Sequence, residues 1–117
     1  MIEVGEYVRI DSDFRLIALG IGEVIKINQD TIYVKMNLDL PISLKTENIT
    51  KHSKNIIDLI EIYDYVNGMI VFEIITYDNG EKELKLSSGY LMGEDEIQDI
   101  LTKEQYQANC YTVERKE

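Results

Sequence analysis

A seven-residue motif occurs twice in the chain and decides the fold: IEVGEYV at Ile2–Val8 and IEIYDYV at Ile60–Val66. Four of the seven positions are identical in the two copies, and two more carry conservative changes. A repeat of this kind indicates that one structural unit is used twice within the same chain.

The features that follow each copy recur in the same order. An apolar run at 22–27 leads to a polar turn and a second run at 31–36, and runs at 69–75 and 82–86 flank the turn Asp78-Asn79-Gly80. These runs are rich in β-branched and aromatic residues, and apolar and polar side chains alternate along them. Because Asn and Gly tolerate the backbone of a tight turn, the pattern predicts antiparallel hairpins with one buried face.

We therefore expect a mainly β protein of two tandem SH3-like or KOW-like small barrels, residues 1–58 forming the first and 59–117 the second. A unit of about 58 residues is marginal alone, so the barrels are expected to pack together. Each half then reaches a short motif, and we take Ile49–Ser53 of the first half to correspond to Leu101–Gln105 of the second. The apolar join at 55–60 fits a closing strand or a short helix, and the strand is favoured.

The end of the chain is expected to hold one short C-terminal helix. Thr102 and Gln105 match the capping-box pattern, which predicts a helix over about 103–109. A closing strand is expected at 110–113, and a further helical turn at 93–97.

Length and composition favour a single small protein of the cytoplasm. Among 117 residues there is one cysteine, Cys110, so no intrachain disulfide can form, as is usual in a reducing compartment. The start of the chain lacks the basic and apolar regions of a signal peptide, and no apolar run approaches the length of a membrane span.

The net charge of −10 is unevenly distributed. Residues 1–58 carry 7 basic and 9 acidic side chains, whereas residues 59–117 carry 5 basic and 13 acidic ones. Tyrosines accompany the acidic residues of the second half, and tyrosine is favoured in protein interfaces. Two interpretations stay open: a solvated acidic surface with the tyrosines partly in the core, or a binding face for a basic partner. The residues of that binding face would be Glu81, Glu83, Tyr90, Glu94, Asp95, Glu96, Asp99 and Glu104.

Patterns for catalysis, cofactors or metals are weak. Cys110 and His52 are the one possible Cys–His pair, but they lie in different repeats. The run Gly20–Gly22 lacks the third glycine of a dinucleotide motif and the lysine of a P-loop. Asp11–Asp13 and Glu94–Glu96 do not fit a calcium loop. We expect no enzyme, no catalytic residue, no cofactor and no metal.

Three blocks carry a resemblance to a known group of proteins. NIIDLIE (Asn55–Glu61), DYVNG (Asp64–Gly68) and ILTKEQ (Ile100–Gln105) resemble small phage and prophage proteins of low-GC Gram-positive bacteria. Ile62-Tyr63 stands where that group has Val-Gly, so the turn before Asp64 is expected to change. The resemblance implies no defined activity and no site residues. In size, charge and implied origin the chain is also similar to anti-CRISPR proteins.

The leading expectation is a phage-derived, non-enzymatic inhibitor that binds a bacterial defence protein, such as a CRISPR–Cas effector, in the host cytoplasm. It would act by occupying a basic nucleic-acid channel with an acidic face that mimics nucleic acid, or by jamming a moving domain. Neutralising Glu94, Asp95 and Glu96 is expected to weaken binding without unfolding the chain. Direct nucleic-acid binding is not expected. Two alternatives stay open: a phage structural or assembly adaptor, and a nucleic-acid-associated module using basic residues of the first repeat, Lys45, Lys51, His52 and Lys54.

Overall fold

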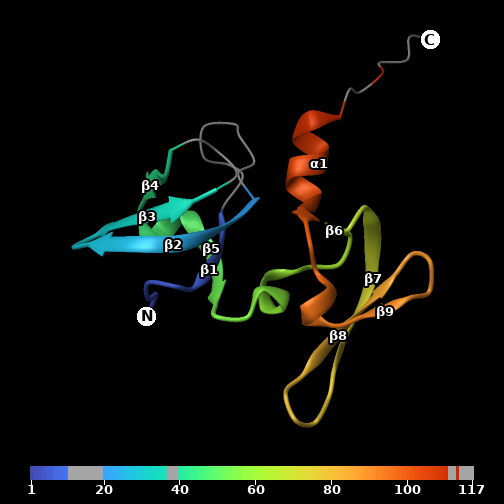
Figure 1. Cartoon of the computed structure of the whole chain (residues 1–117). Coiled ribbons are helices and arrows are strands. Elements are labelled where there is room, and N and C mark those ends of the chain that lie inside the picture. Colours follow the sequence, from blue (N-terminus) through green and yellow to red (C-terminus); the bar gives the residue numbers. More distant parts are fainter. Residues whose placement is uncertain (11–19, 37–39, 111–112, 114–117) are drawn as a thin grey trace.

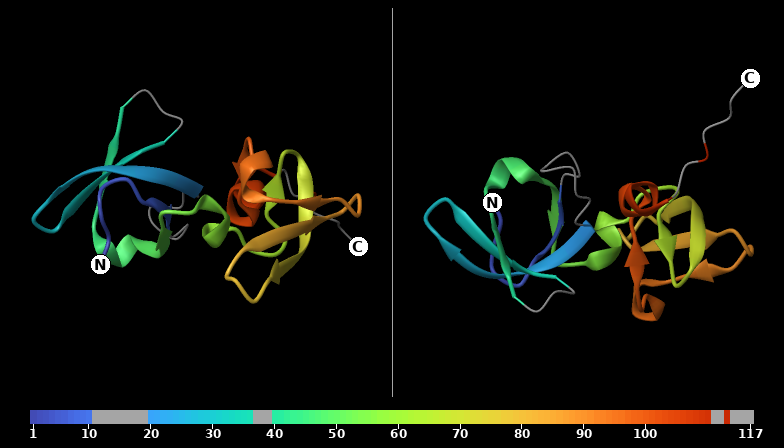
Figure 2. Two further views of the ribbon diagram at one scale, coloured as in Figure 1. Left: turned by 60° about the horizontal axis from the view of Figure 1, so that its bottom comes forward. Right: turned by 90° about the horizontal axis from the view of Figure 1, so that it is seen from above.

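The computed structural model describes residues 1–10, 20–36, 40–110 and 113. Within these residues the chain forms two five-stranded antiparallel sheets and one short α-helix (Figure 1). The prediction of a mainly β protein with one short C-terminal helix is confirmed at this level. The two sheets lie side by side, with the segment that joins them between the two (Figure 2).

The first sheet has the strand order β4-β3-β2-β1-β5. Its central hairpin, β2–β3, turns at Gln29, which adopts a positive φ of 56°. The strands are β1 (Tyr7–Ile10), β2 (Gly20–Asn28), β3 (Thr31–Lys35), β4 (Ile42–Leu44) and β5 (Ile49–Ser53).

The second sheet repeats this order, since its strands run β9-β8-β7-β6-β10 across the sheet. The predicted turn at 78–80 joins β7 to β8, and Gly80 takes a φ of +89° there. The strands are β6 (Tyr65–Val66), β7 (Met69–Thr76), β8 (Lys82–Leu86), β9 (Leu91–Met92) and β10 (Ile100–Leu101).

The two sheets also share the position of an irregularity. The register of β2 with β3 shifts between Val24 and Lys26, and the register of β7 with β8 shifts between Val71 and Glu73. A bulge leaves one extra residue on the longer strand and increases its local twist. Because strand order and bulge position both recur, the repeat seen in the sequence is also a repeat of backbone structure.

The turn that opens each copy is conserved in detail. The amide of Gly5 donates to the carbonyl of Val24 at 2.9 Å, and the amide of Tyr63 donates to that of Val71 at 2.8 Å. Gly5 has a φ of +94° and Tyr63 a φ of +78°. The expected change of this turn at the missing glycine is therefore wrong: Tyr63 takes the left-handed backbone itself, at the steric cost that glycine avoids.

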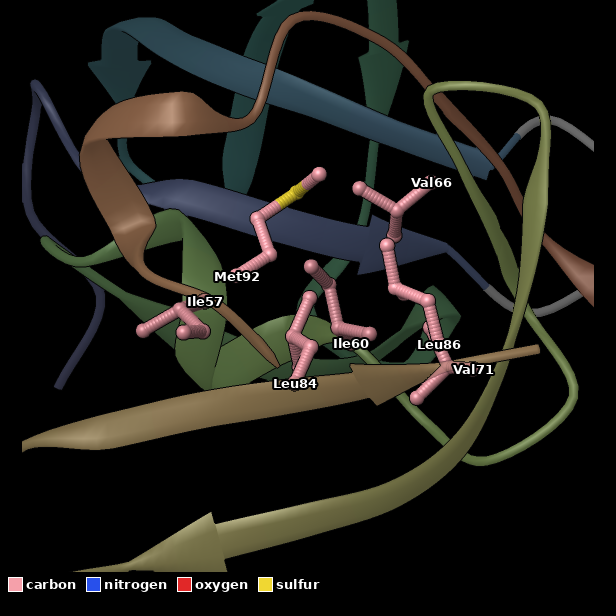
Figure 3. Packing of buried hydrophobic residues seen from close by; sticks show 7 residues of the cluster. All are labelled: Ile57, Ile60, Val66, Val71, Leu84, Leu86 and Met92. Atoms are coloured by element: carbon pink, nitrogen blue, oxygen red, sulfur yellow. The ribbon is translucent and has the colours of Figure 1, made fainter. Parts of the chain in front are cut away.

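Two separate apolar clusters form the cores. The first contains Val8, Ile10, Val24, Ile32, Val34 and Leu44 from the first sheet. The second gathers side chains that point toward one another on one face of β7 and β8: Ile57, Ile60, Val66, Val71, Leu84, Leu86 and Met92 (Figure 3). Alternation along β8 places Leu84 and Leu86 inward, as the sequence pattern predicts.

The join between the repeats is helical, so the favoured strand at 55–60 is wrong. A 3₁₀ turn, η3, covers Ile56–Leu59, and the spacing of Ile57 and Ile60 brings both side chains into the second cluster. The Ser53 hydroxyl accepts from the amide of Asn55 at 3.0 Å and donates to Asp58 at 2.6 Å, which starts the turn. The expected repeat division at 58/59 falls inside this element.

The C-terminal helix α1 (Lys103–Asn109) lies where the capping box predicts it. The Thr102 hydroxyl accepts from the Gln105 amide at 3.1 Å, and the Gln105 side chain accepts from the Thr102 amide at 2.8 Å. The closing strand expected at 110–113 is not formed at Cys110, which ends α1; residues 111–112 lie outside the described residues.

The strand register shows that one predicted correspondence between the repeats, Ile49–Ser53 with Leu101–Gln105, is out of step. Val8 lies opposite His52 of β5, and its counterpart Val66 lies opposite Ile100 of β10. The partner of β5 in the second repeat is therefore the segment 97–101, and matching Ile49–Ser53 with Leu101–Gln105 is wrong. A short 3₁₀ turn precedes each of these segments, η2 (Thr46–Asn48) and η4 (Glu94–Glu96), the second at the predicted position.

Candidate partner-binding groove

An open groove of about 1020 Å³ lies beside the second sheet. Three short segments line it: the join at 55–58, which includes most of η3; the tip of the β7–β8 hairpin; and η4 with Gly93 before it. Figure 1 shows where β7 and β8 lie in the chain. Its lining carries six carboxylates and one ammonium group, namely Asp58, Glu81, Glu83, Glu94, Asp95, Glu96 and Lys82.

Direct contacts tie the three walls together. Lys82 of β8 forms an ion pair with Asp58 of η3 at 2.9 Å. The amide of Ile57 in η3 donates to Glu94 of η4 at 3.2 Å. Because each wall is bonded to a neighbour, the groove is formed before any ligand arrives, which lowers the entropy cost of binding.

Four of the six carboxylates are used by the fold. Asp58 and Glu94 hold the walls, as described above. Glu83 accepts a hydrogen bond from the hydroxyl of Tyr77 at 2.5 Å, and Glu96 accepts from the hydroxyl of Tyr90 and from the amide of Gly93. Among the described residues, no hydrogen bond or ion pair engages the carboxylates of Glu81 or Asp95. Their charge is available to a ligand.

Hydrogen bonds shift the pKa values of two groove carboxylates and of the two tyrosines that bond to groove carboxylates. The hydroxyl of Ser53, followed by Lys82, lowers the pKa of Asp58, and the hydroxyl of Tyr90 lowers the pKa of Glu96. The acceptors Glu83 and Glu96 raise the pKa values of Tyr77 and Tyr90, since a nearby anion disfavours a phenolate. These hydrogen bonds therefore favour the carboxylate form of Asp58 and Glu96 and the neutral form of Tyr77 and Tyr90.

The structure brings together five residues of the predicted binding face and separates three. Glu81, Glu83, Glu94, Asp95 and Glu96 all line the groove. Tyr90 touches it only through Glu96, and Asp99 and Glu104 do not line it. Glu104 binds the buried guanidinium of Arg9 at 2.8 Å, so its charge is committed inside the fold.

Sequence reasoning missed Asp58 and Tyr77 as groove residues. Asp58 stands in the apolar join, and only the helical turn of η3 brings it beside β8. Tyr77 follows the end of β7, directly before the predicted turn at 78–80, and that position was the available signal for a residue at the hairpin tip.

Three of the four basic residues predicted to bind nucleic acid lie beside acids, whereas Lys45 lies 3.5 Å from the hydroxyl of Thr31. Lys51 lies 3.4 Å from Glu61, and the Nδ1 atom of His52 lies 3.0 Å from Glu6. Lys54 lies 3.6 Å from Glu3. These neighbours offset the positive potential that phosphate binding needs.

No hydrogen bond among the described residues joins Cys110 to His52. The imidazole of His52 contacts Glu6, whereas Cys110 is exposed at the end of α1. Interactions with Cys110 and then Tyr65 raise the pKa of Tyr106 to about 12. In the described part of the chain, no three side chains of His, Cys, Asp or Glu are grouped as metal ligands would be. Asp11 and Asp13, which were considered from the sequence as cation ligands, lie outside the described residues.

The described helices include none with the length and apolar character needed to cross a bilayer. Comparison with known proteins gives no family: no family model matches the chain, and neither a curated protein nor a solved structure matches it. The function must therefore be inferred from the groove and its chemistry.

Proposed function

We propose that this protein is a non-enzymatic, phage-derived inhibitor that binds a bacterial defence protein, of the CRISPR–Cas effector class, through the acidic groove. The groove carries six carboxylates against one ammonium group, and this is the observation that carries the proposal. A basic channel that normally holds nucleic acid is the complementary surface, and its lysines and arginines would replace phosphate contacts with carboxylate contacts.

Two properties of the groove support a protein ligand. Its walls are bonded to one another, so an incoming chain meets a formed surface. The exposed rings of Tyr77 and Tyr90 stand beside the carboxylates, and tyrosine offers a large contact area with few rotatable bonds. The resemblance of the sequence blocks to phage proteins and of the overall size and charge to anti-CRISPR proteins narrows the partner to host defence.

The alternative of nucleic-acid binding through the first repeat is less favoured. Its basic side chains Lys51, His52 and Lys54 each lie beside a carboxylate, whereas Lys45 lies beside the Thr31 hydroxyl. Counterion release from DNA or RNA therefore has less free positive charge to drive it. A gel-shift experiment at low salt with duplex DNA and with single-stranded RNA is expected to show no complex.

Binding to purified effectors tests the proposal. The protein is immobilised and exposed to a panel of CRISPR–Cas effector nucleases from low-GC Gram-positive hosts, with and without guide RNA, in about 0.1 M and about 0.5 M salt. We expect one effector to bind at low salt, to bind less at high salt, and to lose cleavage of its DNA target. Absence of binding across the panel, or co-purification with virions instead, would overturn the proposal.

We also propose that each half is an SH3-like barrel. The identical strand order of the two sheets and the shared bulge support a common five-stranded unit. An experimental structure tests this: each sheet should curl until its edge strands approach. Two open, flat sheets would contradict it.

A further inference from the structure

Arg9 belongs to the first sheet, but its bonds lead to the second half of the chain. It lies on β1 between the core residues Val8 and Ile10, and 3% of its side chain is exposed. Side chains alternate along a strand, so Arg9 points away from the core of its own sheet. Both faces of β1 are nevertheless buried, because the second half covers the face that carries Arg9.

The guanidinium group is fully engaged across this junction. It makes two parallel bonds to Asp64, of 2.6 and 2.9 Å. It also donates to the carbonyl of Leu59 at 2.9 Å and to Glu104 of α1 at 2.8 Å, and its Nε atom lies 3.5 Å from Glu61. A fork of this geometry fixes both position and angle, which a point charge would not do.

Asp64 is the matching centre of the second half. Its side chain is 0% exposed, and besides Arg9 it accepts from the amide of Glu61 at 2.7 Å and from the amide of Lys103 at 3.0 Å. One carboxylate therefore joins β1, the turn before β6 and the start of α1. Burial opposes a charged Arg9, but the bonds to Asp64 outweigh it and raise the pKa of Arg9.

Apolar packing between the halves is made by η3, which contacts both sheets and whose Leu59 is fully buried but belongs to neither core cluster. The two core clusters share no residue among those described, and α1 has no buried residue of its own. A further contact of α1 with the first sheet is steric: the Gln105 side chain occupies the space where a Cβ at Gly20 would lie. Halves joined by one short helical turn and a polar junction move relative to each other unless something fixes them.

We infer that Arg9 is a latch that fixes the orientation of the two sheets, and that breaking it frees their relative motion while each core stays folded. The inference does not depend on the proposed function. The first repeat offers an internal comparison: Glu6, the counterpart of Asp64, closes its own turn without an arginine. The local fold of a repeat therefore does not require the latch.

Distance measurements between spin labels on the two sheets test the inference. Ser43→Cys on β4 and Lys85→Cys on β8 supply exposed label sites, with Cys110→Ser removing the native thiol. The latch variant is Arg9→Met with Asp64→Asn, since the oxygen of the introduced carboxamide would still accept from the Glu61 amide. Lys54→Met is the control, because it breaks an exposed ion pair with Glu3 of 3.6 Å.

We expect one narrow distance distribution for the unaltered pair and for the control. In the latch variant the distribution should be at least roughly two-fold broader, while the amide signals of both sheets keep their dispersion. Arg9→Lys, which keeps the charge but loses the fork, should broaden it less and remains informative if the double variant does not fold. A narrow distribution in Arg9→Lys and the double variant, or joint loss of both sheets in each, would overturn the inference.

Discussion

The turns that open the two repeats have the same backbone and different partners. In the first, Glu6 accepts from the amide of Glu3 at 2.6 Å; in the second, Asp64 accepts from the amide of Glu61 at 2.7 Å. Beyond the turn, Glu6 contacts the half-exposed ring of His52 in its own repeat. Asp64 instead meets Arg9 of the other repeat in a fully buried pair.

This difference shows how a duplicated motif gains a second use. The shorter Asp side chain closes the turn through Oδ2 as Glu does, and each of its two oxygens also accepts a hydrogen bond from the guanidinium. A buried ion pair is not in itself a gain in stability, but removing one partner leaves the other charge stranded. The second turn should therefore be much less tolerant of substitution than the first.

The largest expected effect is on stability at position 64. Asp64→Ala removes the one fully buried carboxylate bound to Arg9, which keeps Glu61 and Glu104, and leaves two backbone amides without their acceptor. It should lower the free energy of unfolding by about 3 kcal/mol. Glu6→Ala removes a contact with the half-exposed ring of His52 and should lower the free energy of unfolding by about 1–2 kcal/mol. Urea unfolding of both variants measures the difference. Equal losses would mean that the two turns do the same work.

A smaller effect on stability is expected at the residue before Glu6 and Asp64, and the two repeats should differ in its sign. Gly5 and Tyr63 occupy the same left-handed position, and Tyr63 is 63% exposed, so its side chain contributes little packing. Gly5→Ala should destabilise the protein by about 1 kcal/mol, and Tyr63→Gly should stabilise it by up to about 1 kcal/mol. Thermal unfolding of the two variants checks the signs; a loss of stability in Tyr63→Gly would show that the ring has a packing role.

The smallest expected effect is on how the stability of the fold declines at acidic pH. The hydrogen bond with His52, followed by the Glu3 amide, lowers the pKa of Glu6 below its ordinary value of 4.5. A depressed folded-state pKa stabilises the fold above the unfolded value, and that contribution is lost as pH falls through the folded one. Unfolding followed from about pH 6 to pH 3 should show a shallower decline in Glu6→Gln than in the native protein. Parallel declines would contradict the assignment to Glu6.

Local patterns in the sequence predicted local structure well. The alternation at Leu84 and Leu86 predicted β8, and Thr102 with Gln105 predicted α1. The helical join was missed because Ile57 and Ile60 satisfy both a strand and a turn until the second core is known. At the join, therefore, the decision lay in tertiary packing rather than in propensity.

Local sequence patterns could not predict the junction at Arg9 or the full set of groove residues. Arg9 and Asp64 are 55 positions apart in sequence, and neither has a motif that marks the other. An arginine inside the apolar strand YVRI was the available signal, since a buried cation requires a partner. The acidic composition predicted five groove residues, but it could not separate Glu104, which the fold uses, from Glu81, which it leaves free.

The proposed function assigns partner binding to the carboxylates of the second half, and one measurement tests this directly. Glu81→Gln with Asp95→Asn neutralises the two groove carboxylates that the fold does not use, and it avoids Glu94 and Glu96, which hold η3 and η4. Asp30→Asn with Glu47→Gln makes the same chemical change at exposed sites of the first half.

Affinity for the effector that binds in the purified panel is then compared for the native protein and both double variants. The groove variant is predicted to bind roughly ten-fold more weakly at low salt, with an unchanged unfolding midpoint, and the first-half variant is predicted to bind as the native protein does. Equal affinities of the two variants would contradict the assignment of binding to the acidic groove.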